Sequence, residues 1–260
     1  MNITLNSCCC GLFALLLAFG SPQLYAAAQN ENDEVIAIIK NSSDFLKKQQ
    51  RYSVSAETGY EVVQENGQKI EFGSVREATV QRPNHVRMNF KRRDGISGGV
   101  VLDGKEIVFF NTSDNVYSRV SKPGSINSQM EFLSDELQIP VPMQDFLAPD
   151  FAAKLTGKDT TVNYINSSTV NGVACDHIAI RTDDVDVQIW IAEGKQPLPQ
   201  RIVITYKHEP GQPQFRAQIR EWNLSPKIPA KHFRFTPPKG AEQIPIIAVR
   251  LSQKATGGAK

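Results

Sequence analysis

The chain has 260 residues, of which 40% are hydrophobic and 22% are charged, so it can form one large domain or two small ones around an apolar core. This composition excludes a wholly disordered chain. The 29 basic and 27 acidic residues leave a formal net charge of +2, which is too small to indicate a nucleic-acid-binding protein.

The N-terminal segment has the features of a secretory signal. Its apolar run, residues 8–20, is too short to cross a bilayer as a helix, and three alanines follow at a position suited to cleavage. The mature protein is therefore expected to be periplasmic and to have no transmembrane span. We expect three parts: a signal peptide at residues 1–28 that is cleaved near Ala28, a single domain at residues 29–253, and a mobile tail at residues 254–260.

Removal of the signal peptide would leave one cysteine, Cys175, so the mature protein could form no internal disulfide. No arrangement of histidines points to Cys175 as a catalytic thiol. We therefore predict that Cys175 is a small strand residue.

The mature chain begins with a helix pattern and continues as strands. Asn32 and Asp33 can cap a helix that ends near Gln50 and carries apolar side chains at helical spacing. The hydrophobic period then changes to two, and the turns between the segments are short. Six strands are expected, at residues 52–62, 69–81, 86–91, 96–102, 106–110 and 116–120. Such turns cannot form the crossovers of a parallel sheet, so the pattern predicts an antiparallel meander.

A helical segment then interrupts the meander. Ser125 can cap a helix that runs to about Gln138, and shorter helical pieces are expected at residues 143–147 and 150–155. Further extended segments are expected at residues 160–165, 174–182, 185–191, 201–207, 214–224 and 233–235. The predicted fold class is mainly β (α+β), an antiparallel half-open barrel of about eleven strands with helices covering its concave face.

Arg82 raises a question about this sheet. Counting by twos along residues 69–81 places Arg82 on the same face as Phe72, Arg76 and Val80, which is the more apolar of the two faces. This count holds unless Gly73 introduces a bulge. A cation on that face must find a partner or point into a space that water or a ligand visits. The alternative is a structural arginine that pairs with a buried acid or extends outward at the strand end.

No catalytic motif is evident. The hydrolase elbow, the phosphate loop and the dinucleotide-binding glycine pattern are all absent, and the four histidines have no spacing typical of a zinc site. Asp183, Asp184 and Asp186 could hold a calcium ion, although a turn is the simpler interpretation. We therefore predict a protein that is not an enzyme and that has no cofactor and no resident metal.

Three segments occur in a specific order: ATVQRPNHVRMNF at residues 78–90, VLDGKEIVFFN at residues 101–111 and FRFTPPKGA at residues 233–241. In this order they resemble the LolA/LolB-like superfamily of periplasmic lipoprotein carriers. The segments VNGVACDHIAI (170–180) and VQIWIAEGKQPLPQRIVITY (187–206) more closely resemble a predicted periplasmic family of unknown function that is thought to share this fold.

The resemblance implies an unclosed barrel whose concave side shelters acyl chains without any catalytic residue. Arg82 matches the arginine of the family's Arg-Pro-Asn motif, which bonds to a helical lid and helps to decide between open and closed states. With Arg82, the candidate ligand-binding residues are Phe72, Val80, Met88 and Phe90. The implied function is a periplasmic non-enzymatic binding protein or carrier for lipid or lipoprotein acyl chains. The alternative is an envelope sensor or interaction module that binds a protein partner.

Overall fold

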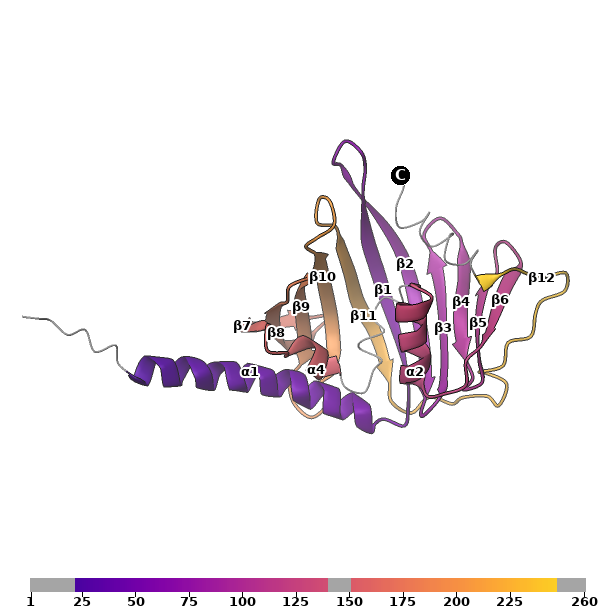
Figure 1. Ribbon diagram of the computed structural model, residues 1–260. Helices are drawn as coiled ribbons and strands as arrows, with labels where there is room; N and C mark the ends of the chain where they lie inside the picture. The colour runs from indigo at the N-terminus through magenta and orange to yellow at the C-terminus, as the bar shows by residue number, and fades with distance from the viewer. Residues whose placement is uncertain (1–21, 140–150, 247–260) are drawn as a thin grey trace, which may run out of the picture.

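The computed structural model describes residues 22–139 and 151–246. Its strands form one open, curled sheet of 12 strands in the order β12-β6-β5-β4-β3-β2-β1-β11-β10-β9-β8-β7 (Figure 1). Every neighbouring pair is antiparallel except β12 and β6, which are parallel. The predicted mainly β, antiparallel fold class is therefore confirmed, with one strand more than expected.

The helices and strands have the following bounds. The helices are α1 (Pro22–Lys48), α2 (Ile126–Glu131), the π-helical turn η1 (Phe132–Glu136) and α4 (Phe151–Leu155). The strands are β1 (Arg51–Val63), β2 (Lys69–Gln81), β3 (His85–Arg92), β4 (Ser97–Leu102), β5 (Glu106–Asn111), β6 (Val116–Ser121), β7 (Thr161–Val170), β8 (Val173–Arg181), β9 (Val185–Ala192), β10 (Pro199–Tyr206), β11 (Gln214–Asn223) and β12 (Glu242–Gln243).

At the edges of the sheet, one predicted strand is too short and one strand was not predicted. β7 continues to Val170, five residues beyond the expected end at Ile165, because an edge strand exposed on both faces shows no alternation of polarity. The short extended piece expected at residues 233–235 is not part of the sheet, and the strand that was not predicted is β12, which pairs with β6. A strand of two residues is too short to carry a hydrophobic period.

The first helix begins earlier than expected. α1 starts at Pro22 and runs through Asn32 and Asp33, so the predicted cap at these two residues is wrong. Proline is favoured in the first turn of a helix, and the alanines that follow are strong helix formers. None of the described helices has an apolar stretch long enough to cross a membrane. Residues 1–21 of the expected signal peptide and the expected tail lie outside the described residues.

One face of the sheet carries the core. α1 and α4 pack against apolar side chains of β7 to β11, and α2 and η1 pack against apolar side chains of β1 to β5. The two clusters share one face, because Tyr52 of one cluster and Tyr60, which packs against the other, have the same parity on β1, and Trp222 packs against both clusters. We call this the inner face and the opposite one the outer face. The expected helix at residues 143–147 lies outside the described residues, so a complete helical cover stays a prediction.

The C-terminal segment crosses the outer face. Phe233 packs on His85 with ring centroids 5.1 Å apart, and Phe235 packs on Phe110 at 5.2 Å and on Tyr117 at 5.5 Å. These partners project from β3, β5 and β6 on the side opposite the core. The FRFTPPKGA segment therefore holds the C-terminal region against the outside of the sheet and does not line its inner face.

Candidate functional site

The four apolar residues predicted for the site all lie on the inner face. On β2, Val80 is opposite Tyr52 and Phe72 is opposite Tyr60. On β3, Met88 and Phe90 follow the same alternation, since their partners on β2 are inner-face residues. No register shift occurs at Gly73, so the count by twos holds along the whole of β2.

Burial divides this inner face into a closed and an open part. Tyr52, Val80 and Val86 are fully buried, and they pack in one cluster with α2 and η1. Phe72 is 37% exposed and stacks on Tyr60 with ring centroids 5.7 Å apart. The predicted site residues are therefore not equivalent, because Val80 belongs to the core and Phe72 does not.

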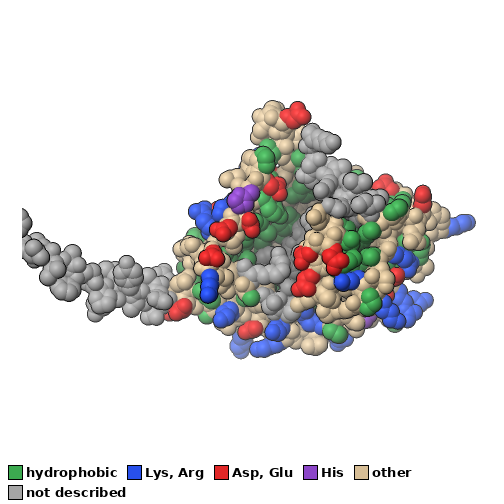
Figure 2. Space-filling view, in the orientation of Figure 1, with side chains coloured by type: hydrophobic (Ala, Val, Ile, Leu, Met, Phe, Trp, Pro, Cys, Tyr) green, Lys and Arg blue, Asp and Glu red, His purple; other side chains and the backbone are tan. Residues whose placement is uncertain are grey.

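Five partly buried or exposed side chains make up what we call the open inner surface: Tyr60, Phe72, Arg76, Met88 and Phe90. They project from β1, β2 and β3, at the middle of the sheet. Figure 2 shows the same side of the molecule as Figure 1, with hydrophobic side chains gathered in a hollow near its middle. Aromatic and thioether side chains around a single cation suit an amphiphilic ligand.

Arg76 is the polar centre of this surface. Its Nε donates a hydrogen bond of 3.2 Å to the Thr58 hydroxyl, and its Cζ lies 5.9 Å from the centre of the Phe90 ring. The Thr58 and Ser74 hydroxyl oxygens are 2.8 Å apart, and both residues are buried. Burial lowers the pKa of Arg76 from its ordinary value, while the nearby Tyr60 phenol opposes this shift. The sequence interpretation placed Arg76 on this face but assigned it no role.

Arg82 lies at the closed end, away from the open inner surface. Its backbone N–H donates to the Gln50 carbonyl at 2.9 Å. Its charge acts on buried Tyr52: burial raises the pKa of that phenol to about 12, and Arg82 opposes the rise. The other two residues of the Arg-Pro-Asn motif, Pro83 and Asn84, contact neighbouring segments of the chain. The Pro83 carbonyl accepts a 3.0 Å hydrogen bond from the N–H of Ile126, the first residue of α2.

Asn84 brings the Arg-Pro-Asn turn close to the Asp-Gly-Lys turn. Gly104 has a φ of +83°, and a Cβ placed on it would lie 2.2 Å from the side-chain nitrogen of Asn84. Only glycine combines this backbone conformation with so close a neighbour. The two turns therefore form one structural unit at the end of the sheet. The role of Arg82 as a latch stays a prediction.

The other sequence candidates are engaged in local contacts. Asp186 accepts hydrogen bonds of 2.7 and 2.8 Å from Arg181, which lower the pKa of its carboxyl. Asp184 lies 3.6 Å from His208. Cys175 lies on the strand β8, as predicted; it is buried there, and burial raises the pKa of its thiol. Within residues 22–139 and 151–246, no three His, Cys, Asp or Glu side chains are grouped as metal ligands.

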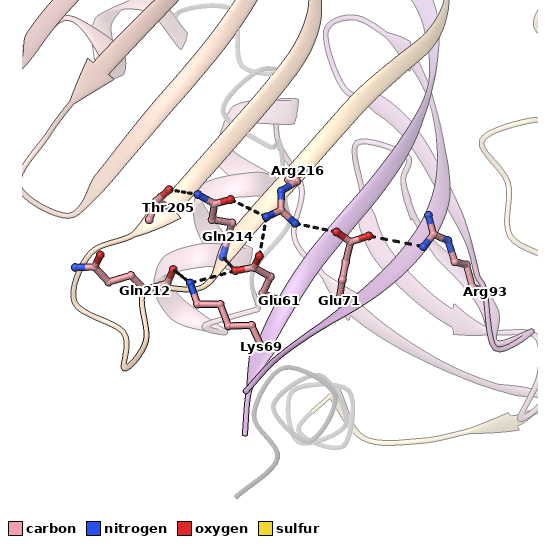
Figure 3. Close-up of polar contacts among 8 residues, drawn as sticks. All are labelled: Glu61, Lys69, Glu71, Arg93, Thr205, Gln212, Gln214 and Arg216. Carbon is pink, nitrogen blue, oxygen red and sulfur yellow. Dashed lines mark hydrogen bonds and ion pairs between the residues drawn. The ribbon is translucent and has the colours of Figure 1, made fainter. Parts of the chain in front are cut away.

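A charged network lies on the outer face behind the open inner surface (Figure 3). Arg216 of β11 donates to Glu61 of β1 at 2.6 Å and to Glu71 of β2 at 2.8 Å. Lys69 and Arg93 extend the network at 3.6 and 3.7 Å. Burial alone would raise the pKa of Glu61, but Arg216 and the Gln214 backbone N–H hold it below its ordinary value. The network joins three strands in the middle of the sheet, so its role is structural.

A separate cavity of about 480 Å³ lies beside the C-terminal segment. Its lining includes His85, Asp103, Lys105, Phe233 and Arg234. None of the predicted site residues lines it. The cavity is therefore distinct from the open inner surface.

One protein family matches most of this chain. The family model described as "Predicted periplasmic protein (DUF2092)" matches residues 35–247. No curated protein sequence matches this chain. The predicted resemblance to a predicted periplasmic family is thus confirmed.

Several solved structures are similar to this chain at low sequence identity. The lipoprotein LppX of Mycobacterium tuberculosis is 15% identical, with 75% of this chain and 98% of that one covered and a TM-score of 0.49. The MucA/MucB complex of Pseudomonas aeruginosa is 15% identical, with coverages of 78% and 61% and a TM-score of 0.43. A LolA superfamily protein of Nitrosomonas europaea is 12% identical, with coverages of 77% and 97% and a TM-score of 0.37. Because the family model spans most of its length, the chain belongs to the DUF2092 family of predicted periplasmic proteins.

Proposed function

We propose that this protein is a periplasmic, non-enzymatic binding protein or carrier that holds the acyl chain of a lipid or lipoprotein on the open inner surface. One observation carries this proposal: Phe72 is 37% exposed on the face of the sheet that otherwise carries the core. Tyr60, Met88 and Phe90 are also incompletely buried there. An apolar surface left open on the core side of a sheet is typical of a ligand site.

The energetics of acyl burial support this function. Each methylene removed from water contributes about 0.8 kcal/mol, so a long acyl chain contributes on the order of 10 kcal/mol before the cost of association. That cost is several kcal/mol or more, which leaves a reversible complex. Binding of this kind needs apolar contact area and no reactive group.

The test is uptake of the neutral fluorescent probe N-phenyl-1-naphthylamine by the purified protein, together with native mass spectrometry of protein taken from its own periplasm. Phe72→Ser is expected to weaken probe binding by about tenfold, since it removes most of one aromatic contact. Ile165→Ser is the matched control, because Ile165 is 47% exposed on the edge strand β7. Equal effects of both changes, or empty protein with no probe uptake, would contradict the proposal.

A second candidate function is binding of a protein partner at the β7 edge. β7 ends the sheet, and most of its residues are exposed. Tyr164, Ile165 and Val173 are exposed hydrophobic residues at or beside it. An open strand edge with apolar side chains favours addition of a partner strand. A periplasmic protein captured by the wild type but not by Ile165→Asp, with probe uptake unchanged, would support this function.

A further inference from the structure

Arg76 lies on the inner face and has no acidic partner among the described residues. Arg87 and Arg201 also lack one, but they lie on the outer face, where they donate to Asn89 and Gln218. Arg119, Arg181, Arg216 and Arg220 each lie within 2.6 to 2.8 Å of a carboxylate oxygen. Among the described residues, Arg76 has no such contact, although it lies on the core side of the sheet. A cation removed from water is costly unless an anion or several hydrogen bonds compensate it.

The surroundings of Arg76 leave much of its hydrogen-bonding capacity unused. A guanidinium carries five N–H donors, and the hydrogen bond to Thr58 uses the one on Nε. The two terminal nitrogens make no hydrogen bond to the part of the chain that the structure describes. Phe90 and the buried Thr58–Ser74 pair hold the group in place. The two terminal nitrogens of Arg76 are therefore held in position among apolar side chains, with their N–H donors unused.

The charge of the site selects the class of ligand. Among the described inward-facing residues of β1, β2 and β3, the cations are Arg76 and Arg92. Arg92 is paired with Asp94, so Arg76 supplies the one guanidinium on these strands that has no acidic partner. One guanidinium neutralises one negative charge, and its planar fork matches the two oxygens of a carboxylate. A long-chain carboxylate combines that single charge with a chain that suits the apolar residues around it.

We propose that the occupant of the open inner surface is a long-chain fatty acid whose carboxylate pairs with Arg76 while its acyl chain lies across Tyr60, Phe72, Met88 and Phe90. This inference rests on the proposed function and adds the headgroup to it. Arg76 binds the ligand directly, and Thr58 is a positioning residue that holds the guanidinium. No covalent step is involved.

The experiment compares ligands that share one chain and differ in the head. Tetradecanoate, tetradecanol and tetradecyl phosphate each displace N-phenyl-1-naphthylamine from the purified protein at about pH 8, where the fatty acid carboxyl is ionised. The wild type is expected to bind tetradecanoate at least about tenfold more tightly than tetradecanol, as one charge-assisted pair would give. Arg76→Met should abolish this preference, because it should weaken binding of tetradecanoate at least about tenfold more than binding of tetradecanol.

Two further variants control the comparison. Arg220→Met removes the same charge from an exposed pair with Glu57, so it should behave as the wild type. Arg76→Lys keeps the charge without the paired donors, so it should retain part of the preference for tetradecanoate. Circular dichroism and urea unfolding check that each variant is folded. An Arg76→Lys protein indistinguishable from the wild type would contradict the paired contact, even if Arg76→Met does not fold.

The possible failures are distinguishable. If the wild type binds neither the probe nor any of the three ligands, the proposed function fails, and this inference fails with it. If tetradecanoate and tetradecanol bind equally well, acyl binding stands and the role of Arg76 is overturned. If tetradecyl phosphate binds more tightly than tetradecanoate, and only when Arg76 is present, the occupant is a phosphate lipid and the fatty acid is overturned.

Discussion

The phenol of Tyr52 is fully buried near the guanidinium of Arg82, at the closed end of the inner face. Its hydroxyl has no hydrogen-bond partner within the described parts of the chain. A buried polar group without a partner destabilises the folded state, because it has given up its hydrogen bonds to water. Burial in this environment also raises the pKa of Tyr52 to about 12.

Tyr52→Phe should retain or increase stability. The change removes the buried hydroxyl and keeps the ring that packs on Trp222 at 5.8 Å. We expect a free energy of unfolding equal to that of the wild type or higher by up to about 2 kcal/mol, measured by urea denaturation. A loss of more than about 1 kcal/mol would mean that the hydroxyl contributes a hydrogen bond to the folded protein.

At alkaline pH, Tyr52→Phe should become progressively more stable than the wild type. The pKa of Tyr52 in the folded protein, about 12, lies above the ordinary value of 10.0. The part of the free energy of unfolding that depends on protonation of Tyr52 is therefore fully present below pH 10 and is lost as the pH rises towards 12. In this window the unfolded chain releases a proton that the folded chain keeps. The expected change in the difference between the two proteins is about 2 to 3 kcal/mol, measured by urea unfolding at increasing pH. A constant difference would contradict the raised pKa.

Gly104→Ala should destabilise the protein more than Gly67→Ala. Both glycines have nearly the same positive φ, +83° and +82°, but a Cβ would meet Asn84 at Gly104 and nothing within 4 Å at Gly67. The backbone strain alone costs about 1 kcal/mol, which Gly67→Ala should show. Gly104→Ala should cost about 2 kcal/mol or more, because Asn84 must also move. Equal losses in urea unfolding would contradict the contact between the two turns.

The strands with one buried face could be predicted from the sequence, and the edges could not. β1 and β2 alternate between core and surface, so polarity alone locates them. β7 has no buried face along most of its length, and β12 has two residues, so neither carries a period. The start of α1 was missed because the alanines were assigned to a cleavage site. Local patterns therefore describe the middle of this sheet better than its ends.

Alternation also predicted which side chains share the inner face, but not how they differ there. Phe72 and Val80 have the same parity on β2, yet one is exposed and the other is buried with α2 and η1. That difference depends on helices that are distant in the sequence. The same count by twos included Arg76, so its place could have been noticed. Its lack of an acidic partner could not be, because ion pairs in this sheet join strands such as β1 and β11.

Glu61→Gln should lower the free energy of unfolding at neutral pH. As the pH falls, the free energy of unfolding of this variant should decrease less than that of the wild type. The folded pKa of Glu61 is lowered, so its stabilising effect is present above the unfolded pKa, about 4.3, and is lost as the pH falls through the folded value. We expect a loss of about 1 to 3 kcal/mol at neutral pH, as for a hydrogen bond to a charged group. The difference from the wild type should narrow below about pH 4. Glu65→Gln, in an exposed turn, changes the net charge equally and should have little effect in the same unfolding experiments.

Arg82→Leu should leave the fold intact and change the rate of ligand exchange. The link between the Arg82–Pro83 turn and α2 is a backbone hydrogen bond from Ile126 to Pro83, so it does not depend on the Arg82 side chain. The charge of Arg82 acts on Tyr52, which packs in one cluster with α2 and η1, so its removal would change the surroundings of these helices. We expect the dissociation rate of N-phenyl-1-naphthylamine, measured by stopped flow, to change by about threefold or more. Arg51→Leu, at the exposed start of β1, is the matched control and should leave that rate unchanged. Unfolding of Arg82→Leu, or a loss of more than about 3 kcal/mol, would instead identify Arg82 as a structural cation whose removal leaves its partners unpaired.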